Sequence, residues 1–246
     1  MRIVRLADHP ELAGSVFAFP AAWPTFMLND PISDLYYDDV TSAYPEYVML
    51  AVDGAEVVAR SFSAPLAFDG DPATDLPAGG WDWVIQQSCL NRFAGKEPTI
   101  VSAVEITVQV ERRGTGLAAK MLDAMRSNIA RLGFRDLVAP VRPNGKPSFP
   151  DEPIAEYAHR TRDDGLPYDP WLRVHVRAGG RIVRPAETSM TIPGTLDQWR
   201  DWTGLPFDKP GPVHVPNALV PVQCEPEHGY AVYVEPNVWV HHKLAD

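Results

Sequence analysis

The residues with the clearest chemical meaning form a glycine-rich turn near the middle of the chain. Arg113-Gly114-Thr115-Gly116-Leu117-Ala118 fits the pattern R-x-x-G-x-G/A and separates an apolar stretch from an amphipathic one. A glycine-rich turn that opens a helix points free backbone N–H groups and the positive end of the helix dipole at one place. This arrangement suits a pyrophosphate, so the sequence predicts a nucleotide-like ligand at the turn.

The elements on either side of this turn can be predicted from their patterns. Residues 99–110 are β-branched and apolar, which predicts a buried strand. Residues 116–132 predict a helix, and residues 136–141 predict the next strand of a βαβ unit. The apolar residues of the helix form one continuous face: Ala118, Met121, Leu122, Met125, Ile129 and Leu132.

Two common nucleotide-binding motifs do not fit the turn. A Rossmann fingerprint needs a third glycine, and Ala119 stands in that place. Asp136 begins the following strand, whereas the ribose-binding acid of a Rossmann fold ends it. The sequence also contains no G-x-x-x-x-G-K-[ST], so a P-loop is excluded.

Glu105 is the best candidate for a general base. It lies on the strand that precedes the turn, and side-chain alternation places it on one face with Thr107 and Gln109. Burying an acid on a mostly apolar strand costs free energy unless the acid has a partner or a purpose. Glu105 is therefore either the base that takes a proton from an attacking amine, directly or through water, or half of a salt bridge to a nearby arginine.

Composition limits the classes of function. The chain has 246 residues and a formal net charge of −10, which disfavours nucleic-acid binding. Residues 111–135 are an exception, with six basic and two acidic side chains that suit an anionic ligand or form a solvated helix face. Cys89 and Cys224 are too few and too distant for a disulfide framework, and His241-His242 has no third ligand that would indicate a metal. No apolar stretch is long enough to span a membrane and no signal peptide is recognised, so we expect a cytoplasmic protein.

The segment from Val108 to Leu122, V-Q-V-E-R-R-G-T-G-L-A-A-K-M-L, resembles the cofactor motif of the GNAT superfamily of acyl-CoA N-acyltransferases. The order of predicted elements over residues 1–192 is also similar to that family. The resemblance implies an α/β (α+β) fold, with a central mixed, mostly antiparallel twisted sheet flanked by helices and extra C-terminal strands. It also implies that backbone amides of the turn hold the pyrophosphate of coenzyme A, namely those of Arg113, Gly114, Thr115, Gly116, Leu117 and Ala118. The pantetheine arm would contact Val108 and Val110.

The resemblance extends to two later residues. Asn144 follows the strand at 136–141 and matches an asparagine that touches the cofactor in the family. His175 stands four residues before Gly179, where the family usually has a tyrosine that protonates the departing thiolate. A histidine with a pKa near 6.5 suits proton delivery at neutral pH, and the alternative is a structural histidine.

The remaining segments give weaker predictions. A first strand is expected at 2–6, a helix at 10–17 capped by Asp8, irregular structure or short helical turns at 18–45 and a hairpin around Asp53-Gly54. Further helices are expected at 81–93, at 171–178 with Asp169 as cap, and at 196–203. Strand character is found at 181–192, 230–234 and 238–242. The acids of the irregular segment, mixed with aromatic residues, either attract a cationic amine or form a solvated loop: Asp30, Asp34, Asp38 and Asp39.

The sequence thus predicts a domain at 1–192 with a proline-rich insertion at 145–168, and a C-terminal extension at 193–246 packed on the same domain. The predicted function is transfer of an acyl group, most simply acetyl, from coenzyme A to an amine of a small molecule by direct attack. One alternative donor is acyl-phosphopantetheine on an acyl carrier protein, which would then be a partner. Another alternative is a non-catalytic acyl-CoA-binding module. The acceptor, the acyl length and the oligomeric state stay open.

Overall fold

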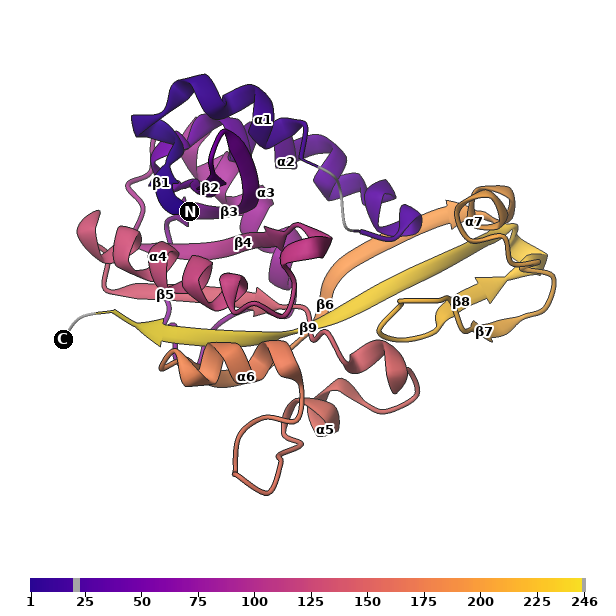
Figure 1. Cartoon of the computed structure of the whole chain (residues 1–246). Helices are drawn as coiled ribbons and strands as arrows, with labels where there is room; N and C mark the ends of the chain where they lie inside the picture. The colour runs from indigo at the N-terminus through magenta and orange to yellow at the C-terminus, as the bar shows by residue number, and fades with distance from the viewer. Residues whose placement is uncertain (20–22, 245–246) are drawn as a thin grey trace.

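A computed structural model describes residues 1–19 and 23–244 of the chain. Its strands form one sheet, in the order β1-β2-β3-β4-β5-β9-β8-β7, with β6 paired to β9 (Figure 1). The strands are β1 (Arg2–Arg5), β2 (Met49–Asp53), β3 (Glu56–Leu66), β4 (Ile100–Val108), β5 (Asp136–Val141), β6 (Arg181–Thr195), β7 (Gly211–Val213), β8 (Val222–Glu225) and β9 (Tyr230–Lys243). All pairs are antiparallel except β4 and β5, which confirms the predicted mixed, mostly antiparallel sheet.

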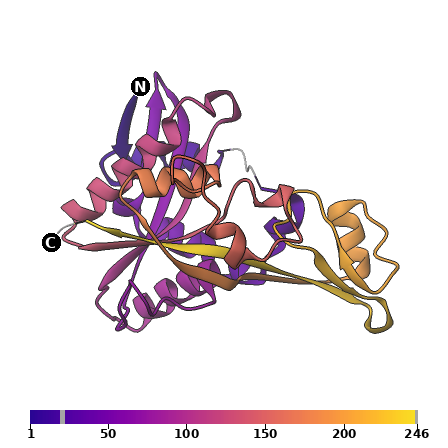
Figure 2. The same ribbon diagram turned by 90° about the horizontal axis from the view of Figure 1, so that it is seen from below.

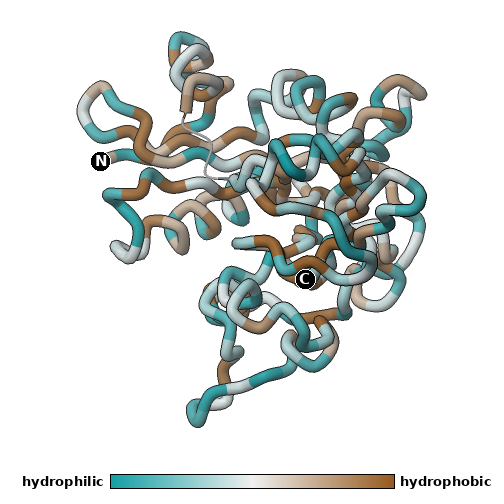
Figure 3. Tube along the Cα trace, turned by 90° about the vertical axis from the view of Figure 1, so that its right-hand side faces the viewer, coloured by the Kyte–Doolittle hydropathy of each residue, from teal (hydrophilic) through white to brown (hydrophobic). Residues whose placement is uncertain are grey.

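The helices cover both faces of this sheet. They are α1 (Ala13–Phe17), α2 (Pro31–Ala43), α3 (Gly80–Phe93), α4 (Leu117–Arg131), α5 (Ile154–Ala158), α6 (Pro170–Arg177) and α7 (Leu196–Thr203). Helices α2 and α3 pack against β3 on one face, whereas α4 and α6 contact each other on the opposite face (Figure 2). Hydrophobic stretches follow the strands between these layers, and many of the outer turns are hydrophilic (Figure 3).

The long strands β6 and β9 extend beyond the helices and carry β7, β8 and α7 as an arm (Figures 1 and 2). The arm has a hydrophobic core of its own, centred on the buried rings of Trp199 and Tyr233. Phe26, from the short 3-10 helix η3 (Thr25–Asn29), packs against both rings with centroid distances of 5.9 and 5.3 Å. The arm is therefore joined to the N-terminal part of the chain and not only to its own hairpin.

Several predicted elements are confirmed, and others differ for identifiable reasons. Helices α3, α4 and α6 lie where the patterns predict them, and Asp169 caps α6 by accepting hydrogen bonds from two backbone amides. The segment predicted as irregular or as short helical turns contains α2, a helix of 13 residues capped by Asp30. Asp8 caps nothing; it lies inside a short 3-10 helix and pairs with Arg5.

The C-terminal region also differs from expectation. The two strands expected at 230–234 and 238–242 are one continuous strand, because Pro236 lies within β9 without interrupting it. Residues 238–243 of this strand pair with the whole of β5, so β9 lies inside the sheet, between β5 and β8. The domain boundary predicted after residue 192 falls inside β6, and the region beyond it supplies both the arm and this central strand.

Candidate active site

The parallel strands β4 and β5 diverge, and this opening is the centre of the candidate site. Their pairing is confined to Val101 with Leu137 and Ser102 with Val138. Immediately beyond these pairs, β4 contains a bulge at Val104, where its register with β3 shifts by one residue. An opening between two strands leaves backbone groups free to bind an extended ligand.

The glycine-rich turn lies where β4 ends and α4 begins. Gly114 and Gly116 have φ values of +75° and +82°, a left-handed conformation that favours glycine. A Cβ atom on either glycine would meet nothing within 4 Å, so the turn is open to solvent. Within the part of the chain that the structure describes, the backbone amides of residues 114–119 have no acceptor. These free amides and the start of a 15-residue helix fit a pyrophosphate.

The other residues predicted to hold the cofactor occupy more varied positions. Val108 is buried at the end of β4 and packs near Leu117, whereas Val110 is exposed in the 3-10 helix η5 (Val110–Arg112). The amide of Arg113 is already bonded to the carbonyl of Val110 at 3.2 Å, so it is not among the free amides. Asn144 is exposed in the turn that follows β5.

Glu105 lies at the centre of a buried hydrogen-bond network on the α2 face of the sheet. Its side chain is only 4% exposed, and Arg60 Nε donates to its Oε1 at 2.8 Å. Thr107 donates to the same oxygen at 2.7 Å, and the Tyr37 hydroxyl donates to Oε2. Burial, followed by the adjacent Glu105 charge, raises the pKa of Tyr37 well above its usual value. The arginine partner that the sequence left open as an alternative is therefore present.

Trp81 connects this network to the bulge in β4. Its ring stacks on Tyr37 with a centroid distance of 5.9 Å, and its Nε1 donates to the carbonyl oxygen of Val104 at 2.9 Å. The backbone amide of Trp81 donates to Ser189 of β6 at 2.8 Å. The start of α3 therefore holds the bulge from the α2 face.

His175 lies on the opposite face of the sheet from Glu105. It is 2% exposed in the last turn of α6, and its Nδ1 is 3.0 Å from Nε2 of His242 in β9. Burial, then the neighbouring His242 and Arg126, lowers the pKa of His175 to about 3. The pKa near 6.5 on which the acid role was predicted is therefore wrong for this environment. The general-acid assignment stays a prediction, and the surroundings favour a structural histidine.

A second buried polar group lies where the arm joins the main sheet. Arg142 Nε contacts both carboxylate oxygens of Glu235 at 3.0 Å, and Glu235 is fully buried. Asp30 and Asp82 lie beside each other in the same region. Sequence reasoning singled out only Asp30 in this group, since each of the others is a lone charged residue in an ordinary helix or strand. No local pattern indicated that they meet.

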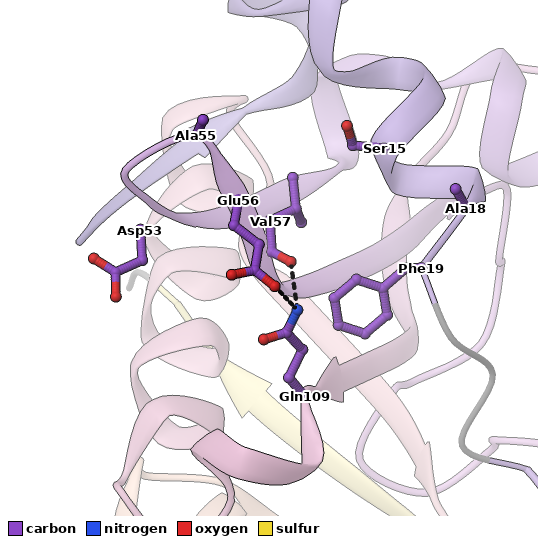
Figure 4. Close-up of a pocket in the computed structure, with 8 residues that line it drawn as sticks. All are labelled: Ser15, Ala18, Phe19, Asp53, Ala55, Glu56, Val57 and Gln109. Carbon is purple, nitrogen blue, oxygen red and sulfur yellow. Dashed lines mark hydrogen bonds between the residues drawn. The ribbon is translucent and has the colours of Figure 1, made fainter.

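A recess of about 500 Å³ opens at the end of β4, close to the glycine-rich turn (Figure 4). The ring of Phe19 forms part of its wall. The guanidinium of Arg60 packs on this ring, with its Cζ atom 5.4 Å from the ring centroid, and so connects the recess to the Glu105 network. The recess is lined by Ser15, Ala18, Phe19, Asp53, Ala55, Glu56, Val57 and Gln109.

Neither a metal-binding cluster nor a membrane-spanning helix is present among residues 1–19 and 23–244. No group of three or more histidine, cysteine or acidic side chains in these ranges is arranged to hold a metal ion. Over the same residues, no helix combines the length and the apolar character that crossing a membrane requires.

Comparison with known proteins identifies a sequence relative and several proteins of similar fold. No family model matches the chain. The arginine N-acetyltransferase avaD of Aspergillus versicolor is 36% identical over 270 residues, covering 97% of this chain and 92% of the relative. The loading GNATL domain of CurA from Lyngbya majuscula has a TM-score of 0.57 at 15% identity, covering 99% of this chain and 96% of that one. The GNAT-like decarboxylase GphF, solved with isobutyryl-CoA, has a TM-score of 0.56 at 17% identity over all of both chains.

Proposed function

Because the chain belongs to the GNAT superfamily of N-acetyltransferases, we propose that it transfers an acetyl group from acetyl-CoA to the α-amino nitrogen of arginine or a close arginine relative. The observation that carries the choice of acceptor is the 36% identity to an arginine N-acetyltransferase across nearly the whole chain. The α-amino group is the nucleophile because an alkyl amine loses its proton far more readily than a guanidinium, which stays protonated at any physiological pH.

The glycine-rich turn supports the choice of donor. The free amides of residues 114–119 would bind the pyrophosphate of coenzyme A, and the divergence of β4 from β5 would receive the pantetheine arm. When bound, acetyl-CoA supplies an acetyl group activated as a thioester. Lys120 is exposed one helical turn into α4 and adds positive charge beside the phosphates.

Glu105 and Tyr37 would handle the proton of the acceptor amine. Three side chains already donate to the Glu105 carboxylate, and Tyr37 is the one of them whose side chain could relay a proton to it, because its hydroxyl donates to Oε2. Tyr37 would accept the proton from the amine as it gives its own proton to Glu105. Arg60 keeps the carboxylate in place, which makes it a positioning residue.

A direct assay tests the proposal. The full chain is incubated with acetyl-CoA and L-arginine, free thiol is measured over time, and the product is identified by mass spectrometry. We expect thiol release that depends on arginine and a product heavier by one acetyl group at the α-nitrogen. Thiol release no faster than in the absence of any amine would reject arginine as the acceptor.

A further inference from the structure

Two aspartates at the junction between the main sheet and the arm have no cationic partner among residues 1–19 and 23–244. Asp30 is completely buried and caps α2, where its Oδ1 accepts from the amides of Ile32 at 2.8 Å and Ser33 at 3.4 Å. Asp82, in the first turn of α3, accepts through Oδ2 from the amide of Thr191 at 3.1 Å. The second oxygen of each carboxyl, Oδ2 of Asp30 and Oδ1 of Asp82, is buried and has no donor among the described residues.

The two aspartates differ from the other buried acids near this junction, because each of those acids is paired with an arginine. Glu105 is paired with Arg60, and Glu235 is paired with Arg142. Asp30 and Asp82 have only each other and the backbone amides. Two adjacent buried carboxyls cannot both ionise without a cation, so in the ligand-free protein they share one proton.

The protonation of the pair agrees with this geometry. Burial raises the pKa of Asp30, and burial together with the Asp30 charge raises the pKa of Asp82 to about 9. The nearest further acids are Asp34 on α2 and Glu235 on β9, and both raise these pKa values further. Asp82 therefore keeps its proton at neutral pH.

We propose that Asp30 and Asp82 form the receptor for the guanidinium group of the acceptor, an inference that rests on the proposed function. A guanidinium presents donors along more than one edge, so it can bond to the free oxygen of each carboxyl. Its positive charge replaces the shared proton, which leaves to solvent, and the site keeps a charge of −1. Trp81 connects the receptor to the reaction centre, because it precedes Asp82 in the chain and holds the bulge carbonyl of Val104 at 2.9 Å.

The receptor predicts discrimination between arginine and citrulline, which has the same length and α-amino group but a neutral ureido end. In the wild-type chain we expect kcat/KM to be about 10- to 100-fold higher for arginine, the range for a hydrogen-bonded charged group. Asp82→Asn should remove most of this preference by raising KM for arginine, with little change in kcat or in KM for acetyl-CoA. Asp30→Asn should act in the same direction, and it retains the cap of α2 because asparagine is also a good N-cap.

A matched control and a second measurement separate binding from folding. Asp34→Asn removes an exposed acid from the first turn of the same helix and should keep the arginine preference. Thermal melting should show that Asp82→Asn is at least as stable as the wild type, because its amide can donate to Asp30. Calorimetry of arginine binding in two buffers of different ionisation enthalpy should show about one proton released per site in the wild type and none in Asp82→Asn.

The outcomes distinguish this inference from the proposed function. If the wild-type chain acetylates arginine and Asp82→Asn keeps the full preference over citrulline, the receptor assignment is wrong while the function stands. If the wild-type chain neither binds nor acetylates arginine, both are wrong. Loss of the preference together with loss of proton release supports the receptor.

Discussion

The two faces of the sheet contribute to the site in different ways. On the α4 face, consecutive residues build the proposed donor site: the amides of residues 114–119 have no acceptor among the described residues, and the turn is open. On the α2 face, the proposed acceptor site is built from side chains far apart in the sequence, such as Tyr37 and Glu105, and most of their polar atoms are already bonded. A ligand fills the first site and must reorganise the second. We therefore expect substitutions on the α4 face to alter cofactor binding and those on the α2 face to alter turnover.

The largest effect should come from Glu105→Gln on the α2 face. We expect kcat to fall by about 10²- to 10⁴-fold, the usual contribution of a general base. Steady-state rates at saturating arginine and acetyl-CoA measure this effect. An unchanged kcat would remove Glu105 as the base and leave it as the partner of Arg60.

Glu235→Gln is the matched control for that experiment. It also breaks a buried glutamate–arginine pair, with Arg142, and should lower stability in a similar way because one buried charge loses its partner. The kcat of this variant should stay close to that of the wild type. Equal losses of kcat in both variants would show that breaking any buried ion pair near the sheet has the same effect, and the contrast between the faces would fail.

The next largest effect should come from Gly116→Val on the α4 face. A valine at φ +82° is strained and crowds the free amides, so we expect KM for acetyl-CoA to rise by about 10- to 100-fold with a smaller change in kcat. Gly133→Val is the control, because Gly133 has φ +94° and equally open surroundings at the other end of α4. Gly133→Val should lower the free energy of unfolding about as much as Gly116→Val does. It should leave KM for acetyl-CoA, measured from initial rates, unchanged.

A smaller effect is expected from Trp81→Phe, which tests whether the α2 face controls the geometry of β4. Phenylalanine keeps a ring that can stack on Tyr37 but cannot donate to the Val104 carbonyl. Losing one hydrogen bond of about 1 kcal/mol should lower kcat about fivefold and leave KM for acetyl-CoA unchanged. Trp239→Phe removes an indole hydrogen bond to Pro77 at 2.7 Å away from the bulge, and its kcat should not fall. Equal losses of kcat in the two variants would show that the hydrogen bond from Trp81 to the bulge does not control turnover.

The smallest effect on turnover should come from His175→Phe. The pKa of His175 is lowered to about 3 by burial, and that of His242 to about 4 by burial and Arg126. Both values lie below the unfolded value of about 6.5, so the unfolded chain binds more protons and stability is lost as pH falls from about 6.5 toward 4. The variant should lose less stability over this range in urea unfolding, with kcat changed less than about twofold. A large loss of kcat would restore the general-acid assignment.

Local signals decided which features could be predicted from the sequence. Asp169-Pro170 before an amphipathic stretch predicts a capped helix correctly, yet the same dipeptide at Asp30-Pro31 begins a helix that the sequence reading missed. The sequence of α2 does not indicate a helix, because acids and aromatic residues interrupt its apolar pattern. The position of the helix is set by packing against α3 and β3, which no local pattern reports.

Within the candidate site, local sequence likewise predicts some features and not others. The glycine-rich turn was found because its residues are consecutive and its chemistry is set by backbone conformation. The partners of Glu105 and the Asp30–Asp82 pair were not found, because they depend on how α2, α3 and the sheet meet. His175 was placed correctly at the end of a helix, but its pKa depends on β9, which pairs with the sheet from far along the chain.

The central position of β9 has a consequence for how the protein is made. During synthesis, β5 is complete long before residues 230–243 leave the ribosome. Until then, the edge of β5 that pairs with β9 has no partner strand. An unpaired, apolar strand edge can add a strand from another chain, so a nascent or truncated chain that lacks residues 230–243 should aggregate. Such long-range pairing also slows folding. Premature termination before β9 would therefore remove solubility as well as activity.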